Sequence, residues 1–143
     1  MKRLFLDTNI VIDFLARRSE FLPAANLIQM AVEGEHVLFM SPLSVANITY
    51  ILRKDFPKDL MKQKLQQLCR FIKISPITEK EINKAFFTEN PDMEDAIQYF
   101  SAESIGADCI ITRDPKHFNY ATIPVMNASE YIAINVNNIK SNK

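Results

Sequence analysis

The sequence predicts an α/β fold, in which helices cover both faces of a mostly parallel central sheet. Short apolar runs alternate along the chain with longer segments of helical periodicity, an order typical of parallel sheets. The first apolar run, residues 4–6, shows no polar alternation, as expected of a strand that is buried on both faces. The chain has 143 residues, of which 48% are hydrophobic and 24% charged, so we expect one domain with a sizeable core.

The sheet is expected to contain four to five strands. Each expected strand is a short apolar run between polar or turn-forming residues: residues 4–6, 36–40, 71–74, 109–112 and 123–126. The last run contains Pro124, which cannot donate a hydrogen bond to a neighbouring strand, so this strand is expected at an edge of the sheet.

Helices are expected where apolar side chains recur every three or four residues. These segments are residues 11–15, 21–32, 41–54, 58–70, 78–89, 92–105 and 129–134. Thr8 or Asn9 is a suitable N-cap for the first helix, and Thr78 and Glu81 form a capping-box pattern at the fifth. The chain's two glycines follow the second and sixth helices and suit their C-caps, and an Asn-Pro pair at residues 90–91 separates the fifth helix from the sixth.

Composition limits the class of protein. Basic and acidic residues number 17 each, and a formal net charge of zero argues against indiscriminate binding to polyanions. The first apolar run is broken at Asp7 and no later run approaches the ~20 residues of a membrane span, so we expect a cytoplasmic protein. One domain is expected over residues 1–134, followed by a polar tail over residues 135–143. Cys69 and Cys109 lie among apolar residues and are expected to be buried free thiols.

Three acidic residues are expected to meet at one edge of the sheet. Asp7 follows the first strand and Asp114 follows the fourth, and parallel strands end at the same edge, where ligands bind in open α/β sheets. Asp95 lies in the first turn of the helix that leads into the fourth strand. Converging carboxylates repel one another, so they need raised pKa values or a cation between them. Oxygen donors and only two histidines in the chain suit Mg²⁺ or Mn²⁺ rather than zinc.

Most of these acids also have an ordinary interpretation. Asp92 and Asp95 can serve as acids at a helix start, and capping is the preferred role for Asp92. Glu94 lies about 100° around the helix from Asp95 and can be solvated. Asp114 can begin a turn, and Asp13 is more simply a solvated or capping residue. Asp7 is the hardest to explain in this way, because a buried strand end is an expensive place for an unpaired charge.

With these acids in this order, the chain resembles a known family, the PIN-domain proteins, and is similar to the VapC-type ribonuclease toxins of bacterial toxin–antitoxin pairs. The resemblance covers residues 4–132 and is carried by three short motifs: residues 6–13, residues 94–96 with Ala102 and 106–108, and residues 111–114 with Phe118. It implies a Rossmann-like three-layer α/β/α sandwich. It also implies Mg²⁺- or Mn²⁺-dependent hydrolysis of phosphodiester bonds, usually in RNA, and commonly a homodimer that is bound by a cognate antitoxin.

The resemblance assigns roles to five residues of this chain. Asp7 matches the family's first metal-binding acid, Asp95 the acid that opens the later helix, and Asp114 the acid after the fourth strand. Asn9 and Thr112 match the polar positions that support these acids.

The chain departs from the family pattern at Asn47. The family usually has a Glu on the helix after the second strand, and Asn47 stands where that Glu is expected. An amide can coordinate a metal through its carbonyl oxygen but supplies no charge, which leaves open whether one or two metal ions bind. Asp92 or Glu94 can compensate for the missing charge, and loss of strong activity is the other interpretation.

Five residues near the expected site can hold an RNA backbone: Arg17, Arg18, Arg113, Lys116 and His117. Solvated surface charge explains each of them equally well.

Two other functions fit part of the pattern. An aspartyl-nucleophile phosphatase of the haloacid-dehalogenase type also has an Asp after its first strand, but it needs a second Asp two residues later, where this chain has Asn9. A PIN fold that binds RNA or a protein partner without turnover also fits, and Asn47 and the zero net charge favour it.

Overall fold

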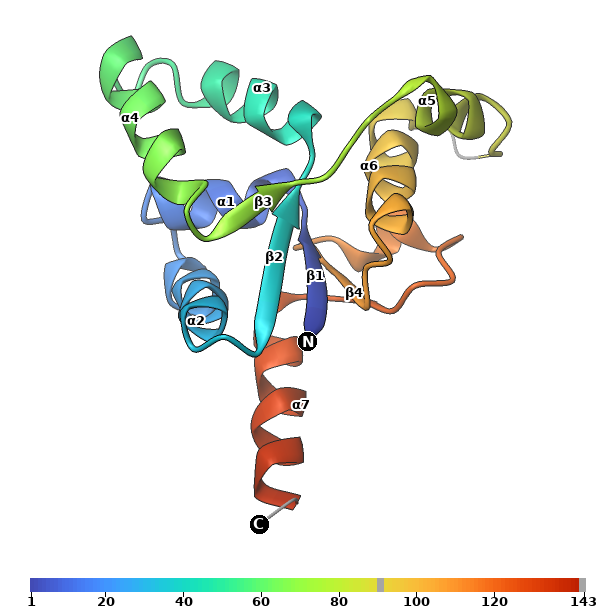
Figure 1. Ribbon diagram of the computed structural model, residues 1–143. Coiled ribbons are helices and arrows are strands. Elements are labelled where there is room, and N and C mark those ends of the chain that lie inside the picture. The colour runs from blue at the N-terminus through green and yellow to red at the C-terminus, as the bar shows by residue number, and fades with distance from the viewer. Residues whose placement is uncertain (90–91, 142–143) are drawn as a thin grey trace.

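The protein is built around a parallel sheet. The computed structural model describes residues 1–89 and 92–141, and its five strands pair in parallel in the order β3-β2-β1-β4-β5 (Figure 1). The strands are β1 (Lys2–Leu6), β2 (His36–Met40), β3 (Ile72–Ile74), β4 (Cys109–Ile111) and β5 (Val125–Met126). The predicted parallel sheet and the edge position of the strand that follows Pro124 are confirmed.

Helices pack on both faces of this sheet. They are α1 (Thr8–Leu15), α2 (Phe21–Val32), α3 (Pro42–Ile51), α4 (Lys58–Leu68), α5 (Glu79–Phe86), α6 (Met93–Ser104) and α7 (Ala128–Ser141), with a short 3₁₀ helix, η1 (Pro115–Phe118). Leu4 and Leu6 of β1 join the core that contains α1 to α4, whereas Phe5 between them joins Tyr99 and Ala102 of α6 on the opposite face. This alternation confirms the predicted three-layer α/β/α architecture (Figure 1).

Three helices begin close to the carboxyl edge of the sheet. Asp7 caps α1 through a hydrogen bond from the Thr8 backbone N–H, Ser41 caps α3, and Asp92 caps α6. The expectation that Thr8 or Asn9 caps the first helix is therefore wrong, because the chain enters the helix directly from the strand. Helix α1 therefore begins three residues earlier than predicted, and Asp7 occupies its N-cap position.

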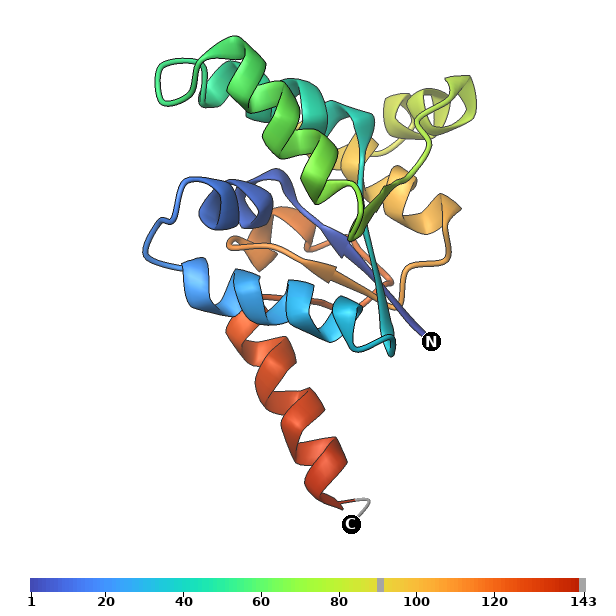
Figure 2. The same cartoon turned by 60° about the vertical axis from the view of Figure 1, so that its left-hand side comes forward.

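Two other expectations at helix ends are confirmed and one is wrong. Thr78 and Glu81 form the predicted capping box of α5, and the glycines that follow α2 and α6 both have positive φ. The terminal helix, expected to end at residue 134, continues to Ser141, and both views show it extending away from the sheet (Figures 1 and 2). No glycine or proline follows residue 128, so the backbone hydrogen bonding continues after the apolar pattern fades.

Three further differences concern short or solvent-facing features. The sequence did not predict η1, because four residues are too few to show helical periodicity. Cys109 is buried as expected, but Cys69 is exposed, because it caps the end of α4 after the helix's apolar face has ended. The expected break at residues 90–91 lies outside the described residues. Across the described residues, no helix combines the length and the apolar character needed to cross a membrane.

Candidate active site

Asp7 lies where β1 ends and α1 begins. Leu6 of β1 pairs with Ile111 of β4, so the two strands end side by side. One Asp7 carboxylate oxygen accepts a hydrogen bond from the Thr8 backbone N–H, and the other accepts one from the Thr112 hydroxyl, both at 2.8 Å. Burial raises the pKa of the Asp7 carboxyl above its ordinary value, and these two hydrogen bonds partly oppose that rise.

Thr112 connects Asp7 to Asp114. Its side chain is buried, and its hydroxyl oxygen also accepts a hydrogen bond from the Asp114 backbone N–H at 3.2 Å. Asp114 directly precedes η1, and its negative charge contributes to the raised pKa of Asp7. The structure therefore brings Asp7 and Asp114 together, with Thr112 between them, and Asn9 follows in the first turn of α1.

Asp95 approaches from α6. Burial, followed by the charges of Asp92 and Asp7, raises the pKa of the Asp95 carboxyl to about 6. His117 of η1 opposes this rise, since its Nδ1 lies 3.7 Å from an Asp95 carboxylate oxygen. Asp95 therefore lies within electrostatic reach of Asp7, and His117 belongs to the same site.

Asn47 faces Glu94. The Asn47 side-chain amide donates a hydrogen bond to a Glu94 carboxylate oxygen at 2.8 Å. Partial burial raises the pKa of Glu94, and the charges of Asp92 and Asp7 raise it further, so Glu94, although exposed, is coupled electrostatically to the other acids. Asp92 caps α6 by accepting from the Asp95 backbone N–H at 3.0 Å, which is the role preferred for it from the sequence.

Asp13 is not the solvated or capping residue that the sequence suggested. It is 1% exposed, and the Arg113 guanidinium donates to its two carboxylate oxygens at 2.9 and 2.5 Å. The pair joins α1 to the segment between Thr112 and Asp114. Arg113, one of the expected RNA-binding residues, is therefore paired within the protein although its side chain is partly exposed, and Arg17, Arg18 and Lys116 are exposed.

A buried polar cluster at the same end of the sheet was not anticipated. It consists of Thr8, Ser41, Ser44 and Gln98, which contribute side chains from α1, from α3 and its N-cap, and from α6. Residue types alone gave little indication of it, because the sequence pattern assigned these positions to helix caps and helix faces.

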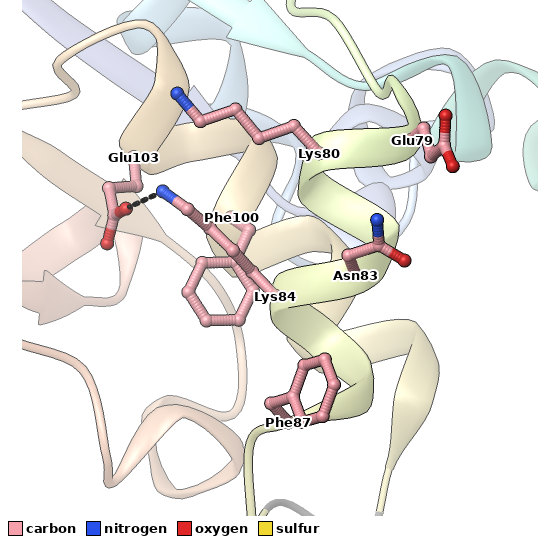
Figure 3. Close-up of a pocket in the computed structure, with 7 residues that line it drawn as sticks. All are labelled: Glu79, Lys80, Asn83, Lys84, Phe87, Phe100 and Glu103. Atoms are coloured by element: carbon pink, nitrogen blue, oxygen red, sulfur yellow. Dashed lines mark hydrogen bonds and ion pairs between the residues drawn. The ribbon is translucent and has the colours of Figure 1, made fainter.

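The larger hollows on the surface lie away from these acids. One, of about 780 Å³, lies between α5 and α6, where the Lys84 ammonium contacts Glu103 at 3.0 Å beside the Phe87 and Phe100 rings (Figure 3). Another, of about 740 Å³, lies between α3 and α4. Neither is lined by Asp7, Asp95 or Asp114, so the candidate site is an open edge of the sheet rather than a deep pocket.

The donor chemistry of the site fits a divalent cation. Like charges and burial raise the pKa values of Asp7, Glu94 and Asp95, and a cation among these carboxylates would relieve their repulsion. Carboxylate oxygens are the ligands that Mg²⁺ and Mn²⁺ prefer. Within the residues that the structure describes, no three His, Cys, Asp or Glu side chains stand close enough together to hold an ion without rearrangement.

These features define an α/β/α protein with an acidic site at the carboxyl edge of a parallel sheet. The chain belongs to the PIN domain family, whose model matches residues 3–116. It is 24% identical over 136 residues to Ribonuclease VapC1 of Aquifex aeolicus (strain VF5), which covers 91% of this chain and 93% of that protein.

Two solved structures share the fold. A chain of VapBC-1 from nontypeable Haemophilus influenzae gives a TM-score of 0.68 at 17% identity, covering 89% of this chain and 98% of that one. A chain of VapBC2 from Rickettsia felis, bound to a DNA fragment from their promoter, gives a TM-score of 0.63 at 17% identity, covering 87% and 97%. At this level of identity the likeness shows the fold.

Proposed function

We propose that this protein is an endoribonuclease that uses Mg²⁺ or Mn²⁺ to hydrolyse RNA phosphodiester bonds. The observation that carries the proposal is the gathering of three acidic residues at one edge of the sheet: Thr112 bridges Asp7 and Asp114, and Asp95 approaches from α6. The raised pKa of Asp95 agrees with such a site, because functional sites often shift the pKa values of their acids. Membership of the PIN domain family and the ribonuclease name of a relative support the same activity.

Asp7, Asp95 and Asp114 would hold the metal, and Glu94 adds a further carboxylate that Asn47 orients. A bound divalent cation would lower the pKa of a water nucleophile and neutralise charge on the phosphate. Thr112 orients the Asp7 carboxylate, so this ligand is held before any ion arrives. Asn9 and Asp92 complete the polar surroundings.

Positive groups beside the carboxylates can receive the RNA backbone. The N-termini of α1, α3 and α6 carry partial positive charge near this edge, which favours a bound phosphate. His117 is 59% exposed beside Asp95, so it can donate a hydrogen bond to a phosphate oxygen. Arg17, Arg18 and Lys116 are exposed and can contact RNA further along the strand, although the Arg17 guanidinium lies over the Phe21 ring.

The test compares RNA cleavage by wild type, Asp7→Asn and Asp95→Asn with Mn²⁺ present. Both substitutions keep the side-chain shape and remove one charge, so cleavage should fall by at least tenfold in each. Asp59→Asn, at an exposed position in the first turn of α4, is the matched control and should cleave as wild type does. Undiminished cleavage in both site variants would refute the proposal.

Asn47 favours a second candidate, a PIN-fold module that binds RNA or a protein partner with weak or no turnover. The amide supplies no charge where the family pattern expects a carboxylate. Calorimetric titration with Mn²⁺ separates the two candidates, because an active nuclease needs the metal and an inert module does not. RNA binding without Mn²⁺ binding would favour the module.

We further propose that the protein is the toxin of a toxin–antitoxin pair, forms a homodimer and is held inactive by a small antitoxin protein. The two structural neighbours are VapBC proteins, which supports such a partner. The groove between α3 and α4 also suits a partner: it is apolar, and its described lining includes Arg53, Lys58 and Lys62 but no acidic residue. Charge complementarity favours an acidic amphipathic segment there.

Expression of this chain in bacterial cells tests the partnership. Growth should stop, and co-expression of a small protein encoded beside this gene should restore it. Normal growth with the chain alone, given intact RNA cleavage in vitro, would argue for a housekeeping nuclease. Sedimentation analysis would determine whether the chain is a dimer.

A further inference from the structure

The buried polar cluster of Thr8, Ser41, Ser44 and Gln98 joins the elements that carry the site acids. All four residues are buried, with exposures between 0 and 5%. Gln98 lies at the centre, since its side-chain amide contacts each of the other three. Its Nε2 donates to the Thr8 hydroxyl at 3.2 Å and to the Ser44 hydroxyl at 2.9 Å, and its Oε1 accepts from the Ser41 hydroxyl.

The hydrogen bonds determine which way the Gln98 amide faces. Ser41 accepts a hydrogen bond from the Ser44 backbone N–H at 3.2 Å, so its own hydroxyl hydrogen is available to the Gln98 oxygen. Both amide hydrogens then point toward Thr8 and Ser44, whose hydroxyls lie 2.8 Å apart. Both donors of the amide are therefore satisfied, and the side chain has one preferred orientation.

Three members of the cluster lie within three residues of a residue of the candidate site. Thr8 directly follows Asp7 and donates its backbone N–H to that carboxylate. Gln98 lies three residues after Asp95, on the same side of α6 and one turn further along. Ser44 lies three residues before Asn47, which binds Glu94, so α3 and α6 are joined by one buried and one exposed contact.

We propose that Gln98 is a positioning residue that sets the separation of the Asp7 and Asp95 carboxylates by holding α6 against α1 and α3. The inference rests on the proposed nuclease function for its catalytic consequence. An apolar side chain could fill the same volume, but dispersion contacts have no direction and permit small shifts between helices. A fully satisfied hydrogen-bond cluster favours one arrangement. The acids repel one another, so without this restraint their helices would separate.

The test uses two substitutions that remove the contacts and preserve the volume. Gln98→Met deletes all three hydrogen bonds of the amide, and Thr8→Val deletes one hydroxyl. With Mn²⁺ and saturating RNA, each should lower kcat by about 10- to 100-fold with little change in KM, since a misplacement of about 1 Å can cost about 100-fold. The double variant should lose less than the product of the two single losses, because both substitutions break the contact between Gln98 and Thr8.

Ser101→Ala is the matched control. Ser101 is also buried on α6, but its hydroxyl contacts Ser75 and the Pro76 carbonyl oxygen, two residues that follow β3. This variant should lose comparable stability in urea unfolding and keep the wild-type kcat. If Gln98→Met fails to fold, Thr8→Val carries the test.

Crystal structures of the metal-free variants give a readout that does not depend on activity. The distance between the Asp7 and Asp95 carboxyl carbons should increase by about 1 Å in Gln98→Met and stay at its wild-type value in Ser101→Ala. An unchanged distance, or a kcat loss equal to that of Ser101→Ala, would overturn the proposal. If the wild type does not cleave RNA, the proposed function fails, and the carboxyl distance still decides the role of Gln98.

Discussion

The ion pair between Asp13 and Arg113 should respond unequally to loss of its two members. The Asp13 side chain is 2% exposed and the Arg113 side chain 37% exposed. Two nitrogens of the guanidinium donate to the two carboxylate oxygens, at 2.9 and 2.5 Å. Arg113→Met therefore leaves a buried carboxylate without its cation. Asp13→Asn leaves a guanidinium that can turn toward water.

The expected magnitudes follow from this difference in exposure. Breaking a buried pair so that one charge stays buried costs about 3–5 kcal/mol, and we expect a loss near the lower end for Arg113→Met. The loss for Asp13→Asn should be about 1 kcal/mol, close to that of an exposed pair. The double variant no longer buries an unpaired charge, so it should be more stable than Arg113→Met alone.

Urea unfolding followed by circular dichroism at neutral pH measures these free energies. Lys116→Met is the control, because Lys116 is an exposed cation three residues after Arg113. Its free energy of unfolding should change by less than about 0.5 kcal/mol. Equal losses in the two single variants, or a double variant no more stable than Arg113→Met, would refute the argument.

Three further predictions concern the acids. Asp95→Asn should raise the Tm of the metal-free protein at pH 7.5, because a carboxyl whose pKa is raised to about 6 in the folded state destabilises that state once it is ionised. Calorimetry should show this gain in Tm at pH 7.5 and not at pH 4. Mn²⁺ affinity, measured by calorimetry, should fall as the pH drops through about 6, because protonated Asp95 cannot ligate, and equal affinities at pH 7.5 and 5.5 would contradict this. Asn47→Glu should lower the metal-free Tm by placing a second carboxylate against Glu94, and Mn²⁺ should restore it; an unchanged Tm would count against close contact between the two.

Most of the fold was predictable because its signals are local. Apolar runs and helical periodicity predicted the order of helices and strands, and the lack of polar alternation in residues 4–6 predicted the buried parallel strand. Features without such signals were missed. The four residues of η1 are too short for a period, and α7 continues to Ser141 through a segment that has no apolar stripe.

The site was predictable only in part, for a similar reason. Strand ends have defined positions in a parallel sheet, so the proximity of Asp7 and Asp114 followed from topology. The contact between Asp13 and Arg113 joins residues 100 positions apart, and no periodic pattern relates them. Gln98 was missed as well, because its partners were explained as helix caps or helix faces, and only the packed helices show that a single amide reaches all three.

Asn47 acquires a different meaning when its partner is known. From the sequence it is a lost carboxylate, which argues for weakened activity. In the structure its amide donates to Glu94, so a carboxylate from α6 is held against α3. The charge of Asp7 raises the pKa of this carboxyl, so Glu94 lies within electrostatic reach of Asp7. Because the amide also stabilises the ionised form of Glu94, it opposes the effects of burial and of Asp92 on that pKa. We therefore expect the pair to offer the proposed metal site a charged oxygen ligand without placing two acids in direct contact, and this expectation favours a metal-dependent nuclease over an inert fold.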